Sequence, residues 1–303
     1  MKTAATQVAV LYMMVLVGFI CDKVKLYTEK TAKATIDLLL YIIGPCIMIN
    51  SFISMEKTEE TVKRFFLSLA IAFVTHFIAI ILNLPFFRKK DNKNPVFKFA
   101  SIYGNVGFMA LPLAEAVLGA EGVFYCTSGV IAYNVITFTH GVAVMSKEKY
   151  KIDIKKLILN PGVISVIIGL PLFLLQVKLP TVITQPISYL GSLNTPVAMI
   201  IFGTYLSKTN LKAMFFEKRI YLTALLKLIV LPLICIGLYS ICAINGSLLV
   251  ASSITASVPC ANNTFMFASK YDRDVETASQ TVALVSFISI LTMPVIIAVA
   301  QSI

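Results

Sequence analysis

Charged residues are scarce in this sequence. Asp, Glu, Lys and Arg make up 14% of its 303 residues, whereas hydrophobic residues make up 58%. A soluble globular domain carries about a quarter of its residues as charged ones. The mean hydropathy of +0.86 departs from that average in the same direction. The composition therefore excludes an ordinary soluble domain and predicts a polytopic membrane protein.

Motifs of metal binding and catalysis are also missing. The chain has no CxxC and no HExxH, and no nucleophile stands beside a base in a recognisable pattern. We therefore expect neither a metal nor another cofactor, and we expect no enzyme. The six cysteines lie in or beside apolar runs and are expected to be small packing residues: Cys21, Cys46, Cys126, Cys235, Cys242 and Cys260.

Apolar runs long enough to cross a bilayer of about 30 Å predict an all-α protein with ten transmembrane helices. The first run is followed by no A-x-A cleavage site, so it is expected to remain as an uncleaved helix. The ten runs are roughly 4–20, 34–54, 65–87, 98–118, 122–145, 161–177, 186–206, 219–243, 247–268 and 275–300.

The basic residues predict the orientation. Most Lys and Arg fall in the connections after the odd-numbered spans, and few fall in the alternate connections. Because positive loops stay on the cytoplasmic side, both termini should face outside a cell membrane. The net charge of +11 is then explained by loop residues facing an anionic lipid surface, so no nucleic-acid partner is expected.

A weak internal repeat appears at an offset near 151 residues. VLVGFI at 15–20 falls on VIIGLP at 166–171, and the fourth span falls on the ninth. The repeat divides the chain into residues 1–150, with helices 1–5, and residues 151–303, with helices 6–10. Because five is odd, the halves must insert with opposite topology. Inverted repeats with a discontinuous helix in each half are typical of secondary transporters.

Both of these matching spans contain helix-breaking residues. The fourth contains GNVGFMALPL at 104–113, and the ninth contains SVPCANNTFMFAS at 257–269. A break in hydrocarbon leaves backbone groups without partners, so it should face an interior site. Half-helix N-termini and asparagine amides can bind a carboxylate there, although small and amide residues can also serve close helix packing. The candidate substrate-binding residues are Gly104, Asn105, Gly107, Pro112, Pro259, Asn262 and Asn263.

These two stretches resemble the crossover regions of the auxin efflux carrier family, and the resemblance extends over the whole chain. Its bacterial members look like malate and malonate permeases. The resemblance implies crossed, broken helices 4 and 9 in a transport domain of helices 3–5 and 8–10. This domain moves against a scaffold of helices 1, 2, 6 and 7. Plant members often carry a second proline where Thr264 stands, so this sequence departs from the plant pattern at the second break.

Three ionisable residues inside the spans are candidates for coupling. Lys227 lies about eight residues into the eighth span, roughly 12 Å at 1.5 Å per residue. It either extends to the interface or acts as an ion-pair partner or substrate counter-charge. His76 is its repeat equivalent, which suggests one interior seam for both, with either a structural or a proton-coupling role. Glu115 is either a coupling site or an interfacial carboxylate.

The sequence thus predicts a secondary transporter of small organic anions, such as mono- or dicarboxylates. The alternative is a sodium-coupled carrier resembling the bile-acid symporters; a channel or receptor on a transporter fold is a weaker one. The expected partners are an organic anion and the lipid bilayer. The sequence is compatible with coupling of transport to a proton or a sodium ion, and with a homodimer.

Overall fold

A computed structural model describes residues 2–89, 91–146, 158–208 and 217–303 of the chain. These residues form helices and no strand. The helices of the first half are α1 (Lys2–Lys23), α2 (Glu29–Leu38), α3 (Gly44–Ser54), α4 (Glu59–Asn83), α5 (Asn94–Ile102), α6 (Leu111–Ile136) and α7 (Val142–Met145). Those of the second half are α9 (Pro161–Leu175), α10 (Thr181–Ser192), α11 (Asn194–Lys208), α13 (Lys218–Leu225), α14 (Leu231–Ile241), α15 (Gly246–Ser257), α16 (Asn263–Lys270) and α17 (Val275–Gln301).

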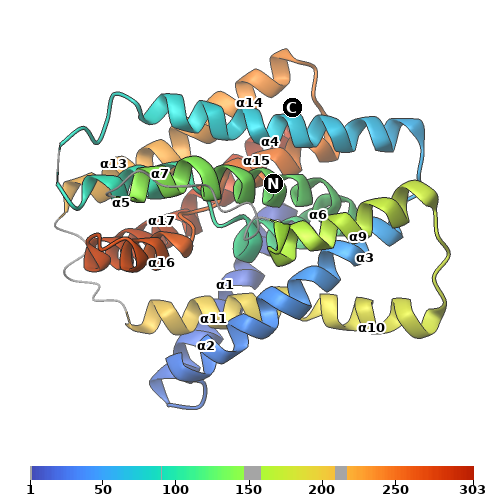
Figure 1. Cartoon of the computed structure of the whole chain (residues 1–303), viewed down its shortest axis with the longest axis horizontal. Helices are drawn as coiled ribbons and strands as arrows, with labels where there is room; N and C mark the ends of the chain where they lie inside the picture. Colours follow the sequence, from blue (N-terminus) through green and yellow to red (C-terminus); the bar gives the residue numbers. More distant parts are fainter. Residues whose placement is uncertain (1, 90, 147–157, 209–216) are drawn as a thin grey trace.

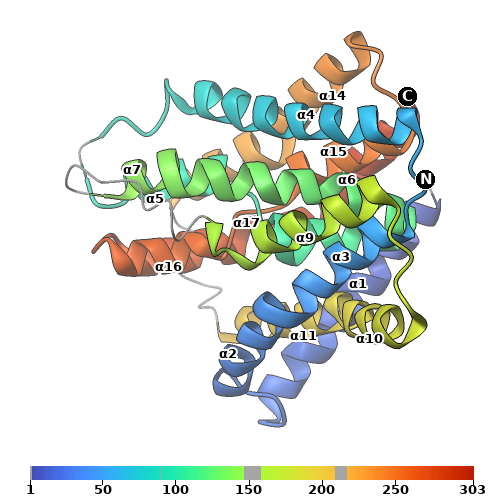
Figure 2. The ribbon, with the colours of Figure 1, turned by 45° about the vertical axis from the view of Figure 1, so that its right-hand side comes forward.

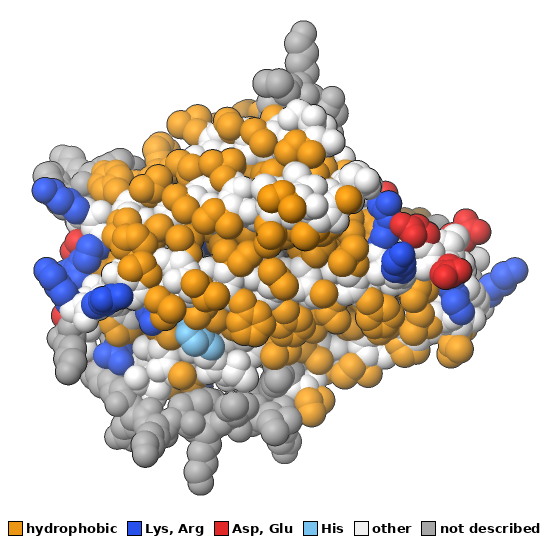
Figure 3. All heavy atoms as spheres, turned by 90° about the horizontal axis from the view of Figure 1, so that it is seen from above, with side chains coloured by type: hydrophobic (Ala, Val, Ile, Leu, Met, Phe, Trp, Pro, Cys, Tyr) orange, Lys and Arg blue, Asp and Glu red, His pale blue; other side chains and the backbone are white. Residues whose placement is uncertain are grey.

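The surface fits a membrane. Six stretches among the described residues are long and apolar enough to cross one, namely Lys30–Ser54, Glu59–Asn83, Val106–Met145, Thr181–Ser207, Lys218–Ile241 and Val275–Gln301. In the space-filling view, hydrophobic side chains cover a broad middle band, and charged side chains gather at its two ends (Figure 3). This is the surface expected of a polytopic membrane protein.

The helices fall into two groups. In both ribbon views α1, α2, α10 and α11 lie together below, and α4 and α14 lie together at the top (Figures 1 and 2). Within the lower group, α1 and α11 approach closely, because a Cβ at Gly18 would fall 2.2 Å from the carbonyl oxygen of Ile200. Likewise, a Cβ at Gly203 would fall 1.9 Å from that of Val15. Glycine therefore brings these two backbones together, as small residues do between membrane helices.

An aromatic cluster joins α3, α4, α6 and α9. Phe52 of α3 contacts Phe65 of α4 and Phe124 of α6 edge-on, with ring centroids 5.5 and 5.4 Å apart. Phe173 of α9 contacts Phe124 at 5.0 Å. All four rings are buried. Such edge-to-face pairs add about 0.5–1.5 kcal/mol each beyond the area that they bury.

Within the described ranges, four wide π-helical turns interrupt the helices, and three of them come directly before an X-Pro pair. These are η1 (Leu39–Ile43), η2 (Val106–Ala110) and η4 (Leu226–Val230), which precede Pro45, Pro112 and Pro232. Proline clashes with the carbonyl four residues earlier. The turns relieve this clash by bonding five residues back, as the amide of Leu231 does to the carbonyl of Leu226. The fourth, η3 (Thr137–Gly141), precedes Val142 instead.

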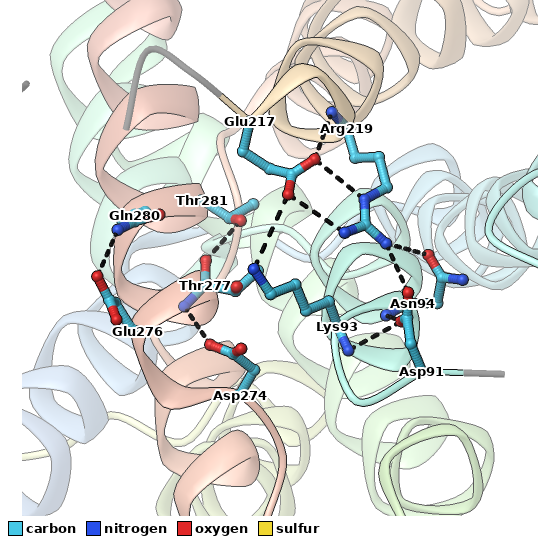
Figure 4. A network of polar contacts seen from close by, with 10 residues as sticks. All are labelled: Asp91, Lys93, Asn94, Glu217, Arg219, Asp274, Glu276, Thr277, Gln280 and Thr281. Carbon is cyan, nitrogen blue, oxygen red and sulfur yellow. Dashed lines mark hydrogen bonds and ion pairs between the residues drawn. The ribbon is translucent and has the colours of Figure 1, made fainter. Parts of the chain in front are cut away.

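A polar network ties α5 to α13 (Figure 4). These two helices lie at the same end of the molecule (Figure 1). Arg219 lies between Glu217 and Asp91, with N–O distances of 3.0 and 2.9 Å, and also donates to Asn94 at 3.0 Å. The hydrogen bond from Arg219 lowers the pKa of Glu217. The pKa of Asp91 is lowered as well: partial burial opposes this, but hydrogen bonds from the Asn94 amide and Arg219 outweigh it.

Candidate functional site

The structure contains a break in each of the two stretches that carry helix-breaking residues. Helix α5 ends at Ile102 and η2 begins at Val106; helix α15 ends at Ser257 and α16 begins at Asn263. The two breaks lie side by side and run antiparallel, with Gly104 paired to Cys260. The amide of Asn105 donates to the carbonyl of Pro259 at 2.8 Å, and the amide of Ala261 donates to that of Tyr103 at 2.9 Å. Each break thus provides hydrogen-bond partners for backbone groups of the other, which an interior shielded from water requires.

The second half of each broken helix begins at an asparagine. Asn105 adopts φ −80° and ψ 65°, an inverse γ-turn, and its side-chain oxygen accepts from the amide of Phe108 at 3.3 Å. It therefore caps η2. Asn262 precedes α16, and its side chain makes no hydrogen bond within the described part of the chain. At Thr264 the amide donates to the carbonyl of Ala261 at 3.0 Å, a bond that a proline there could not make.

A cavity of about 140 Å³ lies against these two asparagines. The segment containing η1 forms part of its wall through Leu39, Gly44 and Pro45. No charged side chain of the described residues lines it. Its polar lining consists of Tyr133 and six asparagines: Asn105, Asn134, Asn160, Asn194, Asn262 and Asn263.

The cavity wall also offers backbone donors. The amides of Gly107 and Asn263 lie in the first turns of the two half-helices, where an amide has no acceptor within its own helix. Among the described residues, neither amide donates to a backbone carbonyl outside its helix. Helix N-termini carry partial positive charge, so such amides favour an anion. The side chain of Asn263 is oriented by Tyr133, to whose hydroxyl it donates at 2.9 Å.

Lys227 and His76 lie on the other side of the first break. Both line a small void of about 10 Å³ together with Gly104 and Thr255. The two side chains therefore face the same small interior void. The alternative in which Lys227 extends to the membrane interface is wrong, because its side chain is 2% exposed and its ammonium lies 3.4 Å from the carbonyl oxygen of Ala256. His76 is held by a contact of 2.8 Å between Nδ1 and the carbonyl of Ala72.

The two glycines of the first break have different roles. A Cβ at Gly104 would fall 2.8 Å from Val258 Cγ2 and 2.9 Å from Lys227 Nζ, so glycine is needed to admit these side chains. A Cβ at Gly107 would meet nothing within 4 Å, and Gly107 lines the cavity.

The two prolines of the predicted site do not line the cavity. Pro112 follows η2, and Pro259 contributes the carbonyl that binds Asn105. Both are buried. They shape the breaks rather than the cavity wall.

Glu115 lies away from both the cavity and the Lys227 void. It is half-buried, and its carboxylate accepts a hydrogen bond of 2.7 Å from Thr195 of α11. This contact joins the fourth predicted span to the seventh.

The sequence interpretation did not include Asn134, Asn160 and Asn194, although they line the same cavity. The signal was present, because each interrupts or borders an apolar run, as Asn105 does. A lone amide in such a run is costly unless it is paired.

Comparisons with known proteins agree with the resemblance to the auxin efflux carriers. An "uncharacterized transporter" of Methanocaldococcus jannaschii is 24% identical over 295 residues, which cover 94% of this chain and 95% of that protein. A "putative malonate transporter" of Rhizobium meliloti is 22% identical over 267 residues, covering 84% and 82%. The family described as "membrane transport protein" matches residues 3–297. The chain therefore belongs to this membrane transport protein family and is a transporter rather than an enzyme.

Proposed function

We propose that the protein is a secondary transporter of small organic anions, such as mono- or dicarboxylates, that binds its substrate in the cavity at the two breaks. The observation that carries this proposal is the cavity lining: asparagine side chains and first-turn amides of the two half-helices, with no acidic side chain among the described residues. Such a lining favours an anion over a cation. A volume of about 140 Å³ suits a molecule of a few carbon atoms or several waters.

The proposed architecture is ten transmembrane helices in two inverted five-helix repeats. Helix α6 supports it, because Gly119 has φ 65° and ψ −150°, which divides this long segment into the predicted spans 4 and 5. The packing pattern supports it too. Predicted helix 1 (α1) packs against helix 7 (α11), and helix 6 (α9) packs against helix 2 (α3). A repeat that relates helix 1 to helix 6 and helix 2 to helix 7 requires these two pairs to be equivalent. The proposed boundary between residues 1–150 and 151–303 lies outside the described residues.

The origin of the cavity walls supports alternating access as the mechanism. The breaks belong to helices 4 and 9 of the proposed transport domain (helices 3–5 and 8–10). Gly44, Asn160 and Asn194, which also line the cavity, belong to the proposed scaffold of helices 1, 2, 6 and 7. Sliding of one group past the other would expose the cavity first to one side and then to the other. We place the protein in the cell membrane with both termini outside, on the loop charges alone.

Uptake by purified protein in liposomes tests the function. Malonate is the first substrate to try, because one relative is named for it, followed by malate and monocarboxylates of similar size. We expect saturable uptake of at least one of these anions and none of choline or of a neutral amide of similar size. Uptake of the cation or the neutral compound, with no anion accepted, would refute the proposal.

A further inference from the structure

The buried ammonium of Lys227 needs a partner. No acidic side chain of the described residues lines the void around it. The walls of this void come from α4, the end of α5, Gly104 in the first break, the start of η2, α14 and α15. No ion pair with Lys227 is found among the described residues. Burying an unpaired charge is costly, so something other than a carboxylate of this void must offset it.

The position of the ammonium indicates what offsets it. Nζ approaches the carbonyl of Ala256, in the last turn of α15, and it lies against Gly104, which follows the end of α5. Helix C-termini carry partial negative charge. In broken-helix carriers, these ends and the unwound carbonyls beside them bind the coupling cation. Lys227 therefore lies where such a cation would bind.

The cavity lies on the opposite side of the same break. Gly104 lines both the cavity and the Lys227 void, so the thickness of one backbone separates the ammonium from a substrate anion. The local sequence favours this placement, because the turn η4 that contains Lys227 is widened ahead of Pro232.

We propose that Lys227 is a built-in cation of the transport site, which takes the place of a coupling sodium ion and balances the charge of the bound anion. The inference rests on the proposed function for its anion, but not for the cation position itself. It favours sodium-independent transport over the bile-acid-symporter alternative.

Removing the side chain tests the cation position without any substrate. Lys227→Ala leaves room for a small cation, whereas Lys227→Met fills the room with no charge. We expect ethylammonium or sodium to raise the melting temperature of Lys227→Ala in detergent, and to leave the parent and Lys227→Met unchanged. A Lys227→Ala protein that folds and responds to neither cation overturns the proposal. If Lys227→Ala does not fold, its expression in the presence of ethylammonium or sodium is compared with that of Lys227→Met. The proposal is then overturned if neither cation restores the expression of Lys227→Ala.

Anion binding is the second measurement. We expect Lys227→Met to bind malonate at least tenfold more weakly than the parent, and Lys227→Ala to recover affinity when ethylammonium is added. The matched control is Lys178→Ala, which removes the same charge from an exposed position and should bind like the parent. Sodium-dependent uptake by the parent overturns the inference. A parent that binds no carboxylate, with the cation effect intact, refutes the proposed substrate class and leaves the cation position standing.

Discussion

Replacing Asn262 with alanine should separate substrate recognition from folding. The Asn262 side chain lines the cavity and makes no hydrogen bond within the described part of the chain. Its loss should therefore change the free energy of unfolding by about 0.5 kcal/mol or less, as at an unconstrained position. A hydrogen bond from its amide to a carboxylate contributes about 1.5–3 kcal/mol. At about 1.4 kcal/mol for each factor of ten, the affinity should fall roughly 10- to 150-fold.

Asn105 provides the comparison, because it also caps η2 through its side-chain oxygen. Asn105→Ala should lose affinity and, in addition, about 0.5–2 kcal/mol of stability. Asn105→Asp keeps the capping oxygen but places a negative charge in the cavity. It should therefore fold well and bind the anion more weakly than the alanine variant.

Calorimetry with malonate and thermal unfolding in detergent measure both effects on each variant. Asn245→Ala is the matched control, because Asn245 is exposed and makes no side-chain capping bond. The reasoning is refuted if Asn262→Ala binds the transported anion like the parent. It is also refuted if the loss of affinity in Asn262→Ala is matched by an equal loss of stability.

Three further predictions concern the glycines of the first break, the polar network around Arg219 and the orientation in the membrane. Gly104→Ala should lower the free energy of unfolding by about 1–3 kcal/mol through overpacking. Gly107→Ala should unfold like the parent but bind the anion more weakly. Equal melting temperatures for the two variants would contradict the roles assigned to these glycines. Arg219→Gln should remove about 0.5–1 kcal/mol of stability at neutral pH. Because Glu217 has a lowered pKa in the folded protein, this contribution is present above the ordinary carboxyl pKa of about 4 and is lost as pH falls through the folded value. The melting temperatures of parent and variant should therefore converge in acid, and a constant difference from pH 7 to pH 3 would argue against the ion pair. In a cysteine-free background, an impermeant thiol reagent should label Thr3→Cys and Ser302→Cys in intact cells but not Asn92→Cys, and the opposite pattern would reverse the orientation.

The sequence was sufficient to predict where the helices break, because the signal is local. Glycine, asparagine and proline weaken a helix wherever they stand, and here they stand at matching places in two apolar runs. The amide residues at 105, 262 and 263 were predicted at the site for the same reason, and the structure brings all three to one cavity.

What the breaks contact could not be predicted in the same way. The hydrogen bonds between Asn105 and Pro259, or Ala261 and Tyr103, join residues more than a hundred positions apart, and no pattern within either stretch specifies that pairing. Lys227 is a second case. Its distance from the end of the span allowed either an interfacial residue or an ion-pair partner or substrate counter-charge. The sequence did not decide between them, because the direction of the side chain depends on the turn ahead of Pro232 and on the space left by Gly104.

The joint between the two breaks is made of main-chain groups, which has a consequence for how such a carrier can evolve. Every amino acid except proline carries the amide that positions 105 and 261 contribute, and every amino acid carries the carbonyl that positions 103 and 259 contribute. Side chains there can therefore be exchanged for others that suit a new cargo while the frame that holds them stays intact. A family with this joint can change its substrate while keeping the main-chain hydrogen bonds that hold the two breaks together.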